Sequence, residues 1–216
     1  MQEFAIGLSA THVIIAITCV VYLLAPPGSA AFEQYKHWPW AEVRRKEYHR
    51  WVSAGFLHGN WAHLLFNMFT LYFFGPFVES WFRELYPTSG GSVFALFYIA
   101  AMIAASVGTY IRHRDNPGFS SIGASGAVAG ILFAAILFQP TIGIMLFFIP
   151  IPIPGFLFGI LYLWYSSYAA RNSADNIDHL AHFYGAIFGF CAPALFQPYL
   201  LYLFFAQLTI YLTNLF

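Results

Sequence analysis

The sequence predicts an all-α protein that crosses the membrane several times. The first observation is composition: of 216 residues, 60% are hydrophobic, 21% are aromatic and only 8% are charged, whereas soluble domains carry about 25% charged residues. The second is a series of six apolar segments close to the length of about 20 residues that a spanning helix requires. Together they exclude a soluble globular protein.

Three of the expected spans lie in the first half of the chain. The first covers residues 8–25 and ends at two prolines and a glycine. The second, 60–79, begins at Asn60, a residue type favoured as a helix N-cap, and the third covers 91–112. The long connection 26–59 contains several aromatic residues and a basic cluster, so we expect a packed loop that is partly embedded in the membrane.

The second half supplies three further spans and an apolar end. The expected spans cover residues 122–138, 155–168 and 179–196. Between the first two of these, residues 141–154 are rich in proline and cannot form a regular helix, because proline lacks the amide donor. We expect that stretch to pack against protein or to lie at the interface. Residues 199–216 form a terminal interfacial helix or a seventh span.

Polar side chains enter three of these spans at one depth. The second, fourth and sixth spans run in the same direction, and His63, Ser125 and His182 each lie in the first turn of one of them. Asn67 follows His63 by four residues and shares its helix face. Polar groups inside the membrane are costly and indicate function. The sequence therefore predicts a polar site in one leaflet.

This set of side chains suits nucleophilic acyl transfer. A serine becomes a nucleophile when a base takes its proton, and His182 is the candidate base for Ser125. The tetrahedral intermediate needs donors for its oxyanion, which we assign to His63, Asn67 and the N-terminus of the fourth span. Gly123 permits close approach of the backbone. A Ser–His dyad is the simplest arrangement, because no carboxylate lies inside a span near the histidine.

Two glycine pairs predict that the fourth and sixth spans cross closely. Gly126-x-x-x-Gly130 follows the serine, and Gly185-x-x-x-Gly189 follows the histidine. Small residues at this spacing let two helix backbones approach each other in membranes. Each pair alone is weak evidence, but both together predict that the two helices bring the serine to the histidine.

Other roles for the polar residues stay open at this point. His179 is a second candidate base, three residues before His182, and Asp178 is a weaker candidate for orienting the histidine. A metal site would use four histidines: His58, His63, His179 and His182. Because the sequence contains no HExxH motif and no carboxylate lies in a span beside these histidines, we predict no metal and no cofactor.

The motifs together resemble the rhomboid family of intramembrane serine proteases. The resemblance rests on Gly-x-Ser-Gly, Ala-His-x-x-Gly and His-x-x-x-Asn in the expected order, and residues 50–68 are similar to the first loop and second helix of that family. It covers residues 43–190. It implies a six-helix core and cleavage of transmembrane substrates by a dyad, here Ser125 and His182, with His63 and Asn67 at the oxyanion.

The sequence departs from the family pattern in two places. Many members carry an aromatic residue four positions after the serine, where it packs on the histidine, and this chain has Ala129 there. The loop motif often written Trp-Arg reads His49-Arg50. The first departure raises the question of what holds His182 in place.

The expected protein is a single membrane domain, residues 1–216 with a core at 43–196, in a prokaryotic inner membrane. Its expected partners are transmembrane protein substrates and the lipid bilayer. The zero net charge, with charges scattered, argues against nucleic acid. Two alternatives are a non-proteolytic rhomboid-like binding or chaperone protein, which would be expected to lack the serine or histidine, and a small transporter, which would be expected to have a midplane site.

The expected orientation conflicts with the charge distribution. The resemblance implies a cytoplasmic N-terminus and an active site toward the outer face. Only Arg83 would then lie inside, against the rule that basic residues gather in cytoplasmic loops. Eight basic residues would lie outside: Lys36, Arg44, Arg45, Lys46, Arg50, Arg112, Arg114 and Arg171.

Overall fold

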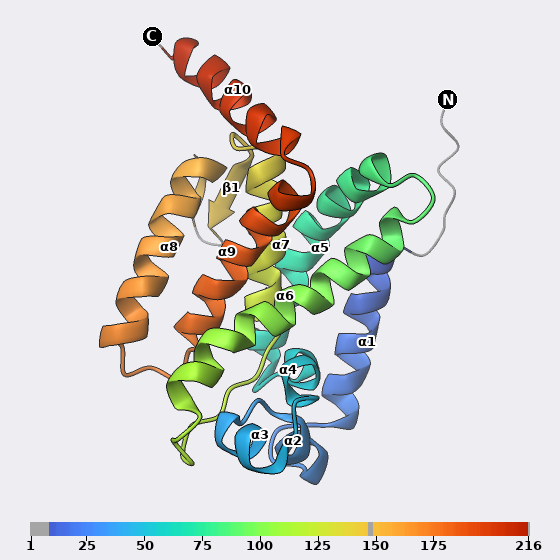
Figure 1. Cartoon of the computed structure of the whole chain (residues 1–216), viewed down its shortest axis with the longest axis vertical. Coiled ribbons are helices and arrows are strands. Elements are labelled where there is room, and N and C mark those ends of the chain that lie inside the picture. The colour runs from blue at the N-terminus through green and yellow to red at the C-terminus, as the bar shows by residue number, and fades with distance from the viewer. Residues whose placement is uncertain (1–8, 147–148, 216) are drawn as a thin grey trace.

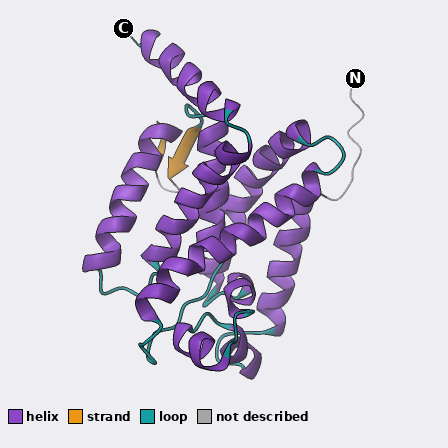
Figure 2. Ribbon diagram, in the orientation of Figure 1, coloured by secondary structure: helices purple, strands orange, loops and turns teal. Residues whose placement is uncertain are grey.

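The computed structural model describes residues 9–146 and 149–215 and shows a helical bundle with two unlike ends (Figures 1 and 2). The bundle consists of α1 (Ala10–Leu24), α5 (Trp61–Leu85), α6 (Gly90–His113), α7 (Ser125–Phe138), α8 (Gly155–Asn172) and α9 (His179–Phe196). Three short helices gather at one end, namely α2 (Ala30–Tyr35), α3 (Pro39–Arg45) and α4 (Arg50–Ser53), with the 3-10 turn η1 (Ala54–Phe56). Helix α10 (Tyr199–Thr213) projects from the other end (Figure 1).

The helices have the length and surface of a membrane protein. Helices α5, α6 and α9 are long and apolar enough to cross a bilayer, while α1, α7 and α10 are apolar but shorter. Large apolar side chains such as Leu23, Leu65 and Trp164 are exposed on the outside of the bundle, which suits contact with lipid. The chain is therefore a helical membrane protein, and the count of six spans stays a prediction.

A two-stranded hairpin corrects the prediction of a purely α fold. Strands β1 (Gly143–Leu146) and β2 (Ile149–Pro154) pair antiparallel, with Gly143 opposite Pro154. The prolines exclude a helix in this stretch, as expected. They leave a strand possible because a two-stranded sheet has only edge strands, where missing donors are tolerated.

Helix α5 runs beyond the predicted end at residue 79 because the charge there is neutralised. The Glu79 side chain is only 2% exposed. Its carboxylate accepts hydrogen bonds from the backbone N–H of Ala10 (3.0 Å) and Thr11 (2.9 Å) in the first turn of α1, and from Arg83 (2.6 Å). A carboxylate at a helix N-terminus satisfies donors that have no partner within the helix. Glu79 thereby fixes α1 to α5.

Helix α7 is the centre of the bundle and packs most extensively against α9. Every residue from Gly126 to Phe138 is buried. A Cβ atom on Gly185 would collide with the carbonyl oxygen of Gly126, and one on Gly189 would collide with that of Gly130. The predicted close crossing of the two glycine pairs is thus confirmed, with backbone packed against backbone.

Replacing Gly185 with alanine is expected to destabilise the protein by about 1–3 kcal/mol, because the added methyl group forces α7 and α9 apart. The measurement is the free energy of unfolding in mixed micelles titrated with SDS. Gly159→Ala on α8 is the matched control, since its Cβ would make only ordinary contacts of 3.5 Å. Equal stability of the two variants would contradict a glycine-dependent crossing.

Candidate active site

Ser125 and His182 lie in contact where α7 and α9 begin. Ser125 Oγ is 2.8 Å from His182 Nε2. Ser125 is the first residue of α7, not the fourth as the predicted span 122–138 implied. The helix begins later because Gly123 has a φ of +114°, which is outside the helical region and suits glycine. The serine therefore lies at the very N-terminus of the helix.

The short α7 sets the depth of this pair. Its 14 residues span about 21 Å at 1.5 Å per residue, less than the roughly 30 Å of a bilayer hydrocarbon core. A helix that begins below the membrane surface exposes its unpaired N–H groups and positive dipole end to the site. Ser125, which is half-buried, therefore lies where the helix end creates a local positive potential.

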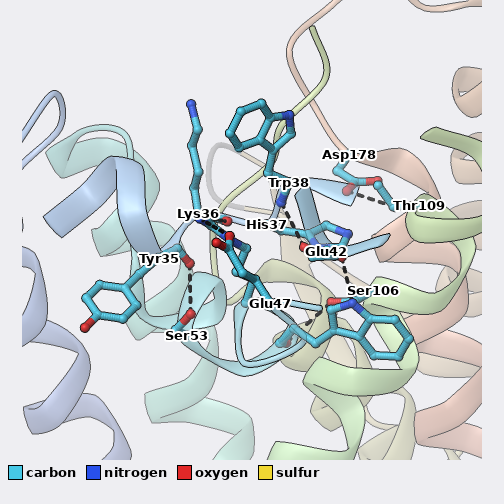
Figure 3. Close-up of polar contacts among 12 residues, drawn as sticks. Tyr35, Lys36, His37, Trp38, Glu42, Glu47, Ser53, Ser106, Thr109 and Asp178 are labelled. Atoms are coloured by element: carbon cyan, nitrogen blue, oxygen red, sulfur yellow. Dashed lines mark hydrogen bonds and ion pairs between the residues drawn. The ribbon is translucent and has the colours of Figure 1, made fainter. Parts of the chain in front are cut away.

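The other two candidates near the histidine have structural contacts of their own. The Asp178 carboxylate accepts from the backbone N–H of Ala181 at 3.0 Å and from Thr109 Oγ1 at 2.7 Å (Figure 3). It therefore caps α9 and ties it to α6, and the suggestion that it orients His182 stays a prediction. His179 Nε2 lies 3.2 Å from the Asp175 carboxylate, so His179 does not face the serine.

An aromatic ring from a different helix takes the place that Ala129 leaves. The ring of Tyr162 on α8 lies 6.4 Å from that of His182, centroid to centroid, with 31° between the planes. His179 is the second ring beside it, at 6.0 Å and edge-on. Of these two rings beside His182, Tyr162 comes from α8 and His179 from α9 itself, while position 129 of α7 is an alanine.

The three residues predicted for the oxyanion each make a different contact. A Cβ on Gly123 would lie 2.6 Å from His63 Nε2, so the imidazole packs directly on the glycine. Asn67 is 5% exposed, and its Nδ2 donates to the backbone oxygen of His63 at 2.9 Å. The Gly123 N–H donates to Ala54 O at 3.0 Å, which makes Gly123 a conformational element and not an oxyanion donor.

His58 holds the backbone next to the serine. Its ring is fully buried, and Nε2 accepts from the N–H of Ala124 at 3.5 Å. Burial, together with the neighbouring His63, lowers the pKa of His58 to about 4, so the ring is neutral at physiological pH and can accept. With the Gly123 and Ala124 amides engaged, the N–H of Ser125 has no acceptor within residues 9–146 and 149–215.

A cleft of about 900 Å³ leads to the dyad. Residues of α5, α7 and α8 line it, together with His182 of α9. Its lining includes the dyad and the two predicted oxyanion side chains, together with apolar residues: Phe66, Val128, Ala129, Leu132, Phe158 and Tyr162. The described residues contain no cluster of three metal-ligating side chains. The cleft can thus admit an extended apolar peptide to the serine.

Comparison with known proteins identifies the family. A family model described as the Rhomboid domain matches residues 45–199. The chain belongs to the rhomboid family. The match includes the dyad, His63 and Asn67, and it agrees with the resemblance seen in the sequence.

Individual relatives come from a plant and a bacterium. RHOMBOID-like protein 12, mitochondrial, of Arabidopsis thaliana is 34% identical over 64% of this chain and 43% of its own length. Rhomboid protease GluP of Bacillus subtilis is 31% identical over 70% of this chain and 27% of its own. Rhomboid-like protein 11, chloroplastic, of Arabidopsis thaliana is 33% identical over 42% and 29%. The chain thus spans less than half the length of each.

The loop between α1 and α5 of this rhomboid protein braces the segment before the serine. His37 and Ser121 exchange two backbone hydrogen bonds, at 3.0 and 2.9 Å. The buried Glu42 carboxylate fixes the same turn: it accepts from His37 Nδ1 at 2.7 Å, from the Trp38 N–H at 2.9 Å and from Trp51 Nε1 at 2.8 Å (Figure 3). These contacts pack the loop against the bundle, while its partial embedding in the membrane stays a prediction. The sequence did not indicate that Glu42 fixes this turn.

Arg50 anchors the base of this loop. Its side chain is buried, Nη1 donates to the backbone oxygens of Glu33 (3.2 Å) and Lys36 (2.9 Å), and Nε donates to the Glu47 carboxylate (2.7 Å). Arg50, the arginine of the family's loop motif, therefore has a structural role in this chain, although the residue before it is His49.

Proposed function

We propose that this rhomboid protein is an intramembrane serine endopeptidase that cleaves transmembrane segments through an acyl-enzyme. The observation that carries the proposal is the 2.8 Å contact between Ser125 Oγ and His182 Nε2 at the end of an apolar cleft. A relative named as a rhomboid protease, GluP, supports the same class of activity.

Acylation uses the dyad as nucleophile and base. Ser125 Oγ attacks the scissile carbonyl carbon while its proton passes to His182 Nε2. The new C–O bond gives a tetrahedral oxyanion. When that intermediate collapses, the C–N bond breaks and His182 returns the proton to the leaving amine, which leaves an ester on Ser125.

Deacylation repeats the sequence with water. A water molecule gives a proton to His182 as it attacks the ester carbon, and collapse of the second tetrahedral intermediate returns the proton to Ser125 Oγ. The second product leaves as a carboxylic acid, which then loses its proton to solvent. Both halves need no carboxylate partner for the histidine, which agrees with Asp178 being engaged by Thr109 and Ala181.

The oxyanion donors we propose are the N–H of Ser125 and the side chains of His63 and Asn67. The first belongs to the N-terminus of α7, where the helix dipole favours negative charge. The other two line the cleft beside the serine. Such donors act strongly in a site that excludes bulk water.

The proposed substrate is a transmembrane helix that unwinds near one end. A peptide bond inside a helix is shielded by its own hydrogen bonds, so a segment must become extended before its carbonyl reaches Ser125. Glycine or proline near the scissile bond lowers the cost of unwinding. We therefore propose cleavage after a small residue that has a helix breaker nearby.

We further propose that the protein lies in a prokaryotic inner membrane with its N-terminus in the cytoplasm and its cleft toward the outer face. Half of the eight basic residues that conflict with this orientation form ion pairs with acids, with Arg44 and Arg114 sharing Asp115. Arg50 is held by Glu47, Lys36 by Glu33 at 2.6 Å, and Arg44 contacts Asp115 at 3.6 Å. A basic residue that is paired with an acid influences the direction of membrane insertion less than an unpaired one does.

Ser125→Ala and His182→Ala are each expected to abolish cleavage while the protein stays folded, because nucleophile and base act as one unit. The assay follows a reconstituted model substrate with a Gly-Pro pair near one end of its transmembrane helix, and a serine-directed fluorophosphonate probe. The control substrate has leucine at both breaker positions and should be cleaved slowly.

The outcomes of this assay separate the possibilities. Cleavage by Ser125→Ala near the wild-type rate would overturn the assignment. Equal cleavage of the two substrates would overturn the proposed substrate preference alone. Wild-type protein that binds the substrate but neither cleaves it nor reacts with the probe would indicate a non-proteolytic role.

His63→Ala and Asn67→Ala are expected to lower kcat by about 10²–10³-fold, the usual effect of losing one oxyanion donor. KM should change little, because the interaction forms only in the transition state. Initial rates over a range of substrate concentrations measure both constants. Thr70→Ala, a change at another residue lining the cleft on α5, is the control. A variant that raises KM alone would belong to substrate binding instead.

Single cysteines at Ser89 and Ser173 test the orientation. Ser89 precedes α6 and Ser173 follows α8, at opposite ends of the bundle (Figure 1), and both are exposed. In a background lacking Cys19 and Cys191, an impermeant thiol reagent added to intact bacterial cells should label position 173 and not 89. The reverse pattern would put the cleft in the cytoplasm.

A further inference from the structure

We propose that Tyr162 is a positioning residue for His182, and that it makes the geometry of the base depend on the position of α8. The inference rests on the proposed dyad and concerns its regulation. Tyr162 is the ring from α8 at 6.4 Å from the imidazole, tilted by 31°. Ring pairs at separations of 4.5–7 Å attract each other beyond simple burial.

The Tyr162 ring is itself held by neighbouring rings. Phe133 of α7 lies 5.5 Å from it, and Phe158, one turn earlier on α8, lies 5.7 Å from it. Tyr162 and His182 both line the cleft. The contacts with Phe133 and Phe158 leave one face of the Tyr162 ring directed toward His182. The tyrosine thus limits the rotation of an imidazole that has no carboxylate partner in the described part of the chain.

Helix α8 is attached to the bundle by one side only. Its buried residues are few and mostly small: Gly155, Gly159, Ser166 and Ala169. It packs mainly on α9, with smaller contacts to α7 and the hairpin, and it borders the cleft opposite α5. A displacement of α8 that widens the cleft also withdraws Tyr162 from His182.

This arrangement links substrate entry to the readiness of the base. With α8 in the observed position, the ring packs on His182 and the 2.8 Å contact to Ser125 is formed. With α8 displaced, the imidazole loses its packing partner and the nucleophile loses its oriented base. An aromatic residue at position 129 would not have this property, because α7 is buried on all sides.

The test compares four variants. Tyr162→Phe keeps the ring, Tyr162→Leu removes it, and Tyr162→Leu/Ala129→Phe moves a ring from α8 to α7. Tyr168→Leu is the matched control, the same change on the same helix at a side chain that is 57% exposed. The readouts are the rate of fluorophosphonate labelling of Ser125, and kcat and KM in proteoliposomes.

Loss of the ring is expected to lower both the labelling rate and kcat by about 10- to 100-fold, the effect of misplacing a catalytic group, with KM nearly unchanged. Tyr162→Phe and Tyr168→Leu should behave as wild type. The double variant should recover most of the labelling rate, because position 129 lines the same cleft as His182 and offers a ring from α7 in place of the lost one.

Several results would overturn the proposal. One is labelling of Tyr162→Leu at the wild-type rate. A second is a change in KM alone, which would make Tyr162 a substrate contact. A third is a double variant that is labelled no faster than Tyr162→Leu, which would indicate a general loss of packing. Wild-type protein that does not react with the probe at all would instead refute the dyad itself.

Discussion

The backbone contact between α7 and α9 is the constraint on which the rest of the structure depends. Gly185 and Gly189 pack on the carbonyls of Gly126 and Gly130, so the two helix axes approach as closely as main chains allow. The serine precedes one glycine pair and the histidine precedes the other, each within a turn. The 2.8 Å contact between their side chains is therefore a consequence of the crossing, and any side chain at the crossing separates both the helices and the dyad.

Three carboxylates follow a second constraint, that polar groups withdrawn from water must be paired. Glu79 accepts from the first turn of α1, Asp178 from the first turn of α9, and Glu42 from the turn next to Ser121. Each carboxylate satisfies backbone donors that would otherwise be costly to bury. The hydrogen bonds of these three acids thus hold helix ends and turns in place.

The sequence predicted those parts of the site that depend on local spacing. The glycine pairs, the N-cap Asn60 and the first-turn positions of the polar residues follow from helix periodicity. It did not predict the later start of α7, since a positive φ at Gly123 depends on the packing of His63 and on the Ala54 carbonyl. Interactions between distant segments, such as His37 with Ser121, leave no periodic signal, and neither does the rotation that turns Tyr162 toward His182.

The packing around His182 gives a physical reason for the absence of an aromatic residue at position 129. Ala129 and Tyr162 border the same cleft and belong to the same apolar cluster with Phe133 and Leu132. One ring fills the space beside His182, and a second from α7 would compete with it at the cost of overpacking. The choice of helix therefore decides which part of the protein holds the ring beside His182. A ring on α7 would belong to the rigid centre of the bundle, whereas a ring on α8 belongs to the helix that also forms a wall of the cleft.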